Sequence, residues 1–181
     1  MSELDARNAS LKLLQAVLLK HRSIDDAFDA AARGLEARDR AFVHMLTATT
    51  LRRIGQIDGV LQQFVTKIPP DPVLNLLRLG TAQVLFLGTP AHAAVATTVA
   101  LVKTRQPKLT GLANAVMRRI SEKGAGIVAS QAAGRMNTPD WLWDSWLSSY
   151  GAPATQATAE AHLLEAPLDL TVKDASSAND W

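Results

Sequence analysis

The chain has 181 residues, a formal net charge of +2 and no cysteine. The lack of cysteine excludes a disulfide framework, a cysteine-ligated zinc or iron–sulfur site and a cysteine nucleophile within this sequence. Aromatic residues make up only 5% of the chain, which favours helices over a β-sandwich or barrel. The start has no basic stretch followed by an apolar run, and Pro90 interrupts the most apolar window. We therefore expect no secretory signal and no membrane span, and we expect a cytoplasmic protein.

The charges are unevenly distributed along the chain. Residues 1–135 carry 18 basic and 10 acidic side chains, for a net charge of +8. Residues 136–181 carry 1 basic and 7 acidic side chains, for a net charge of −6. Such a division indicates two functional segments rather than one uniform domain.

Apolar residues at helical spacing predict seven helices in the first segment. The first carries the stripe Leu11, Leu14 and Leu18, and Ser23 is placed to cap a short second helix that ends by Gly34. The fifth is apolar nearly all round, so we expect it to lie at the centre of the bundle. This fifth helix is expected from residue 71 onward, and the third, fourth, sixth and seventh are expected at about 36–54, at about 56–68, at about 91–104 and after Pro107.

The last part of the chain differs in pattern. Pro139 begins a helix with three tryptophans, Gly151 breaks it, and a further helix is expected to about Glu165. We expect the tryptophans to pack on a neighbouring domain rather than to stack on bases. Residues 168–172 alternate apolar and polar, which predicts a strand. The sequence thus predicts an all-α bundle (1–137), a helical connector (138–166) and the beginning of a truncated α/β domain (167–181).

Candidates for catalysis or metal binding are weak. Asp25 and Asp29 lie four residues apart on one predicted helix face, but carboxylates at a helix start are normally solvated. His92 is expected to have a local structural role at a helix start, and the four histidines show no ligand-like spacing. We expect no catalytic residue, cofactor site or metal site in this chain.

Basic clusters give a stronger signal. The seventh predicted helix aligns Gly111, Asn114 and Arg118 on one side, away from its apolar stripe. Arginine forks bind phosphates with two hydrogen bonds, and bound cations release counterions, so such arrays favour nucleic acid. The alternative for any single arginine is a solvated face with a carboxylate neighbour such as Asp39 or Glu122. With +8 on one segment, RNA or DNA binding is the better interpretation.

Several of these segments together resemble one family over about residues 5–122. Residues 77–87, 90–95 and 108–118 are similar to the central helix, the next helix start and the K-x-x-G-h-x-N-x-h-h-R helix of NusB-like domains, where h is apolar. Asp39-Arg40-Ala41 and Leu51-Arg52 also fit. Ala82 departs from the pattern, since an aromatic residue is common there, which implies a smaller core side chain.

The resemblance allows two settings. NusB-like domains occur as free transcription antitermination factors, which bind RNA together with a ribosomal protein, and as the N-terminal part of Sun/Fmu-type rRNA (cytosine-5) methyltransferases. Arg118 stands where free factors usually have an acidic residue. Residues 139–142, 146, 150–151 and 168–173 are similar to the connector into the methyltransferase part, although Thr171 and Lys173 replace its usual Arg and Asn. Both features favour the second setting.

The resemblance implies an RNA-binding N-terminal domain of a small-subunit (16S) rRNA methyltransferase. The cysteine nucleophile and the S-adenosylmethionine site of that chemistry would belong to a catalytic domain absent from this chain. Expected partners are ribosomal RNA and the chain's own methyltransferase domain, with a ribosomal protein only for an antitermination factor. A third possibility is a protein-docking helical module that binds no RNA. The expected RNA contacts are Arg7, Lys12, Arg40, Arg52, Lys103, Arg105, Lys108, Asn114 and Arg118, where Asn114 reads a base edge or caps a helix.

Overall fold

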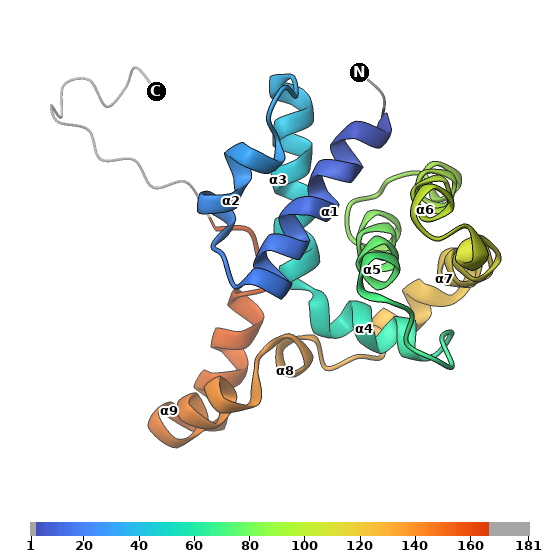
Figure 1. Ribbon diagram of the computed structural model, residues 1–181. Helices are drawn as coiled ribbons and strands as arrows, with labels where there is room; N and C mark the ends of the chain where they lie inside the picture. Colours follow the sequence, from blue (N-terminus) through green and yellow to red (C-terminus); the bar gives the residue numbers. More distant parts are fainter. Residues whose placement is uncertain (1–2, 167–181) are drawn as a thin grey trace, which may run out of the picture.

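A computed structural model describes residues 3–166, and over this range every regular element is helical (Figure 1). The prediction of an all-α fold is confirmed, while the strand expected at 168–172 lies outside the described residues. The elements are α1 (Glu3–Lys20), α2 (Ile24–Ala31), α3 (Ala37–Arg52), α4 (Ile54–Gln62), α5 (Asp71–Leu85), α6 (Ala91–Arg105), the 3-10 turn η1 (Pro107–Leu109), α7 (Thr110–Ala129), α8 (Ala133–Asn137) and α9 (Asp140–Ala161).

Helix boundaries follow local chemistry. The Ser23 side chain accepts a hydrogen bond from the Asp26 backbone N–H at 3.1 Å, which caps α2 as predicted. Prolines stand immediately before α5, α6 and α9. Gly151 has φ of 75° and interrupts α9, because few other residues adopt that backbone conformation without strain. The prediction for α4 was too long, since the helix ends at Gln62 and residues 63–70 form a loop.

Helix α5 lies at the centre of the bundle, in contact with α1, α3, α4, α6 and α7. Val73, Leu77 and Gly80 on this helix are buried. A Cβ on Gly80 would lie 2.5 Å from Thr98 Oγ1 and 2.8 Å from Met117 Cε, so the small residue lets α6 and α7 pack directly on α5. The main core joins these helices to α1, α3 and α4.

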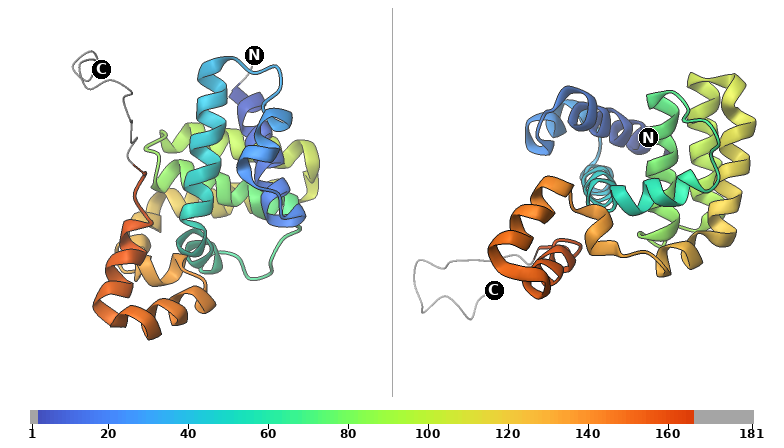
Figure 2. Two further views of the ribbon diagram at one scale, coloured as in Figure 1. Left: turned by 90° about the vertical axis from the view of Figure 1, so that its left-hand side faces the viewer. Right: turned by 90° about the horizontal axis from the view of Figure 1, so that it is seen from below.

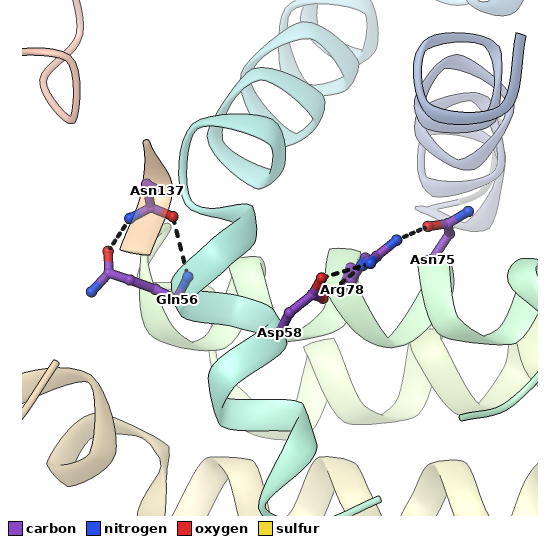
Figure 3. A network of polar contacts seen from close by, with 5 residues as sticks. All are labelled: Gln56, Asp58, Asn75, Arg78 and Asn137. Carbon is purple, nitrogen blue, oxygen red and sulfur yellow. Dashed lines mark hydrogen bonds and ion pairs between the residues drawn. The ribbon is translucent and has the colours of Figure 1, made fainter. Parts of the chain in front are cut away.

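Helix α8, which the sequence analysis missed, packs directly on α4. A Cβ on Gly55 would lie only 1.8 Å from the Met136 carbonyl oxygen, so no side chain fits between the two helices. Asn137 closes the contact, because its Oδ1 accepts from the Gln56 backbone N–H at 3.1 Å and its Nδ2 donates to Gln56 Oε1 at 3.0 Å (Figure 3). Helix α8 thereby attaches the connector to the bundle.

The hairpin formed by α6 and α7 lies on the side of the molecule away from α9 (Figures 1 and 2). Helix α2 is also distant from this hairpin, with α1 and α5 between them in both figures. The α6–α7 hairpin therefore lies apart from both α2 and α9. Within residues 3–166, no helix is both long and apolar enough to cross a membrane.

Candidate nucleic-acid interface

Four of the predicted RNA contacts are exposed on one hairpin. Lys103 lies in the last turn of α6, Lys108 in η1, and Asn114 and Arg118 on α7. Residues 103, 108 and 118 form no ion pair among the residues that the structure describes. We name this set, Lys103, Lys108, Asn114 and Arg118, the cationic face.

The α7 side of the cationic face is open. Gly111, Asn114 and Arg118 follow the spacing i, i+3 and i+7, and all three are exposed. A Cβ on Gly111 would meet no atom within 4 Å, so nothing in residues 3–166 covers this part of the helix. Glu122 lies one turn beyond Arg118 and adds a negative charge at that end. Arg119 and Lys123 are also exposed on α7, so the basic surface of this helix continues past Arg118.

Arg105 and Lys12 extend this region toward α1. The Arg105 Nη2 donates to the Asn8 side-chain oxygen, which joins the end of α6 to α1. Lys12 is exposed one helical turn beyond Asn8, so both residues lie on the same side of α1. Arg105 is thus partly occupied in holding two helices together, while Lys12 is available to a partner.

Arg7 is placed elsewhere. Its side chain is buried, with 8% of the residue exposed, and its Nε donates to Gln83 Oε1 of α5 at 2.7 Å. The guanidinium also lies over the Phe42 ring, 5.1 Å from the ring centroid. Arg7 joins α1, α3 and α5, and an RNA phosphate could reach it only if those helices separated.

Arg40 also serves the fold. Its Nη2 donates to Asp29 Oδ1 at 2.7 Å, and its guanidinium lies 4.9 Å from the centroid of the Phe28 ring. Asp29, a weak candidate for paired-carboxylate chemistry with Asp25, thus holds α2 against the start of α3. Arg40 lies on this α2 side, away from the cationic face.

Arg52 lies in a separate groove along α3. The groove has a volume of about 570 Å³. Its lining residues include Arg38, Phe42, Met45 and Arg52. Glu165, beyond α9, also lines this groove and adds a carboxylate. The Arg52 groove is therefore distinct from the cationic face.

Arg53, next to Arg52, is a partly buried cation. It donates to Gln56 Oε1 at 3.0 Å and to the Leu163 carbonyl oxygen at 3.2 Å. Burial lowers the pKa of its guanidinium, and the neighbouring positive charge of Arg52 lowers the pKa further. The guanidinium still carries its charge at neutral pH, and it links α4 to the end of the connector.

The aromatic residues of α9 differ in exposure. Trp146 packs edge-on against His162, with ring centroids 5.2 Å apart, and Trp143 lies under the Arg135 guanidinium. Trp141 and Tyr150 are 72% and 70% exposed. Trp146 thus joins the two halves of α9, and Trp143 joins α9 to α8. Trp141 and Tyr150 are available to contact another domain.

One basic residue beside the cationic face was missed. Lys67 is exposed in the α4–α5 loop and lines a groove together with Lys108. Its isolated position in the sequence gave no cluster signal, and the fourth helix was expected to include it. His92 is exposed at the start of α6, and over residues 3–166 no group of three acidic or histidine side chains could hold a metal ion.

Comparison with known proteins defines the class. The NusB family matches residues 4–122 of the chain. The chain belongs to the NusB family, as its motifs predicted.

The curated relatives make the comparison more specific. Proteins named ribosomal RNA small subunit methyltransferase B are 34% identical over 172 residues in Xanthomonas campestris, 36% over 137 in Thermus thermophilus and 33% over 171 in Vibrio cholerae. These alignments cover 92%, 74% and 91% of this chain, but only 38%, 32% and 39% of the relatives. The chain therefore spans roughly a third to two fifths of their length.

Proposed function

We propose that this chain is the RNA-binding N-terminal domain of a small-subunit rRNA cytosine-5 methyltransferase and that its cationic face holds the substrate RNA. The observation that carries the proposal is a group of exposed cations on one hairpin that form no ion pair in residues 3–166, namely Lys103, Lys108, Arg118, Arg119 and Lys123. The names of the relatives supply the substrate class. The same proposal places the protein in the cytoplasm with that RNA.

The cationic face would act by positioning. Lysine and arginine contacts to phosphates release condensed counterions and fix the orientation of the RNA without reading its sequence. A tethered RNA-binding domain raises the effective concentration of substrate near a linked catalytic domain. Asn114 stands between Lys108 and Arg118 and offers an amide that can bond to a base edge or a 2′-hydroxyl.

The methyl transfer itself would require residues that this chain does not have. The reaction class needs a cysteine thiolate, and the sequence contains no cysteine. An S-adenosylmethionine site of the usual kind follows a strand of an α/β sheet, whereas the described residues form helices only. The residues present do not fit the cofactor. The cysteine thiolate and the S-adenosylmethionine site would therefore both belong to a separate methyltransferase domain.

Helix α9 is the part that we propose contacts that domain. Trp141, Leu147 and Tyr150 are exposed on it. Aromatic residues are enriched at protein interfaces relative to the rest of the protein surface, so this cluster marks an interaction surface. The same feature would serve a docking module without RNA binding, and an antitermination factor would need a ribosomal protein in addition. The names of the relatives favour the methyltransferase setting over both.

The proposal is tested by the salt dependence of RNA binding. The triple variant Lys103→Met, Lys108→Met and Arg118→Met should lower the slope of log affinity against log salt by about 2 on single-stranded segments of a small-subunit rRNA fragment, since each phosphate contact contributes about 0.7. The matched control removes three exposed charges around α2, with Lys20, Arg22 and Arg33 replaced by Met. Equal slopes for the two triple variants would contradict the assignment, and a wild-type slope near zero would contradict phosphate-driven binding altogether.

A further inference from the structure

A groove separates the α4–α5 loop from the turn between α6 and α7. Its volume is about 1020 Å³, at the upper end of the usual size for ligand pockets, about 300–1,000 Å³. Phe64 and Ile68 line it from the loop, and Leu109 and Leu112 line it from η1 and α7. Ile68 is 75% exposed, an unusual position for a large apolar side chain without a covering partner in the described chain.

The charges around this groove are mainly positive. Lys67 comes from the loop side and Lys108 from η1, both are exposed, and neither forms an ion pair within residues 3–166. Asp71, at the start of α5, is the carboxylate that lines the groove. Lys108 also belongs to the cationic face, so the groove is continuous with the proposed path of the phosphates.

We propose that this groove receives an unpaired base of the bound RNA, while Lys67 and Lys108 contact the phosphates on either side of that base. The inference rests on the proposed function and adds a preference for single-stranded RNA. A phosphate inside the groove would lose water against apolar side chains and would face Asp71. A neutral, flat base keeps its charged backbone outside and packs its face against Ile68, Leu109 and Phe64.

Asp71 gives the groove a chemical preference. A carboxylate accepts a hydrogen bond from an exocyclic amine, such as N4 of cytosine, and uracil has no such amine. Thr66 and Gln106 add neutral hydrogen-bonding groups to the same lining. We therefore expect cytosine to be favoured over uracil in the groove.

The experiment compares single-stranded and duplex RNA on the full 181-residue chain. Ile68→Ala should weaken binding of a short oligocytidine by about fivefold, since the substitution removes most of the apolar surface that residue 68 offers to the base. It should leave the affinity for a blunt-ended RNA duplex without a loop unchanged, because a paired base cannot enter the groove. Leu164→Ala is the matched control, since Leu164 is 67% exposed near the end of α9, and it should change neither affinity. Unfolding in urea verifies that both variants keep the wild-type stability.

The outcomes separate this inference from the proposed function. Wild-type protein that binds neither RNA contradicts the proposed function itself. If the wild type binds both RNAs and Ile68→Ala binds the oligocytidine as tightly as the wild type does, the base-binding groove is overturned and the proposed function stands. That result is expected if an apolar protein segment fills the groove. A second variant, Asp71→Ala, should remove the preference for oligocytidine over oligouridine, and an unchanged preference would contradict the role of Asp71.

Discussion

Two regions of this molecule use polar and basic residues in different ways. At the polar junction, defined as Gln56, Asp58, Asn75, Arg78 and Asn137, every side chain has a partner. Arg78 donates Nε and Nη2 to the two Asp58 oxygens at 2.7 and 2.6 Å, and Nη1 to Asn75 Oδ1 at 2.9 Å (Figure 3). On the cationic face, Lys103, Lys108 and Arg118 have no such carboxylate among the described residues.

The difference separates basic residues that hold the fold together from basic residues that are free to meet a partner. An arginine whose hydrogen bonds are satisfied inside the fold loses more by turning to a phosphate than an exposed lysine does. Residues at the polar junction should therefore affect the free energy of unfolding, and residues on the cationic face should affect RNA affinity. Paired substitutions in the two regions test this separation.

The largest effect is expected for Arg78→Met. The ion pair with Asp58 is half-buried, with side-chain exposures of 17% and 31%, and the buried Asn75 amide would lose its donor. We expect a loss of about 2–3 kcal/mol in the free energy of unfolding, measured in urea. Lys108→Met, on the cationic face, should change it by less than about 0.5 kcal/mol.

A second substitution identifies the source of that loss. The double variant Arg78→Met and Asp58→Asn should recover part of the stability, because the unpaired carboxylate is gone. An Arg78→Met protein as stable as the wild type would mean that the polar junction does not hold α4 to α5.

The next effect is expected for Arg7→Met, which tests a residue that the sequence placed among the RNA contacts. The buried Gln83 side chain would lose its arginine donor, and the packing of the guanidinium on Phe42 would be lost. We expect about 1–2 kcal/mol of destabilisation and an unchanged salt slope for RNA binding. A lower slope at constant stability would return Arg7 to the interface.

A smaller effect is expected at the contact between α8 and α4. Asn137→Ala removes one acceptor for the Gln56 backbone N–H and one donor to its side chain, both only half-buried. We expect a loss of about 1 kcal/mol. Relative to the wild type, the variant's amide hydrogen exchange should accelerate more in α8 and α9 than in α5, because the connector depends on this contact. An equal acceleration in all three helices would contradict that dependence.

The sequence predicted the fold well where local chemistry decides it. Ser23, the prolines before α5, α6 and α9, and Gly151 mark boundaries through backbone preferences of single residues. The central place of α5 followed from an apolar surface on all sides. Helix α8 could not be predicted, because five residues have too little periodicity and the helix depends on Gly55, about 80 positions earlier.

The candidate site was predicted less completely because it depends on burial. Arg7 and Lys12 are both basic residues of α1, and nothing local separates them. Only the packing of α5 shows that Arg7 faces Gln83, 76 positions away, while Lys12 remains exposed. Lys67 was missed because it is isolated in the sequence. It lines the same groove as Lys108 only because the α4–α5 loop folds back toward η1.

The smallest effect is expected for Lys12→Met, and it sets the limit of the cationic face. Lys12 lies one turn from Asn8, which bonds Arg105 at the end of α6, so the phosphate path can extend to α1. One lost phosphate contact should lower the salt slope by about 0.7 and leave the free energy of unfolding unchanged. Arg33→Met, which removes an exposed charge beyond α2, should leave the slope as it is. If both variants keep the wild-type slope, the interface ends at Arg105, and α1 contributes to it only through the hydrogen bond between Asn8 and Arg105.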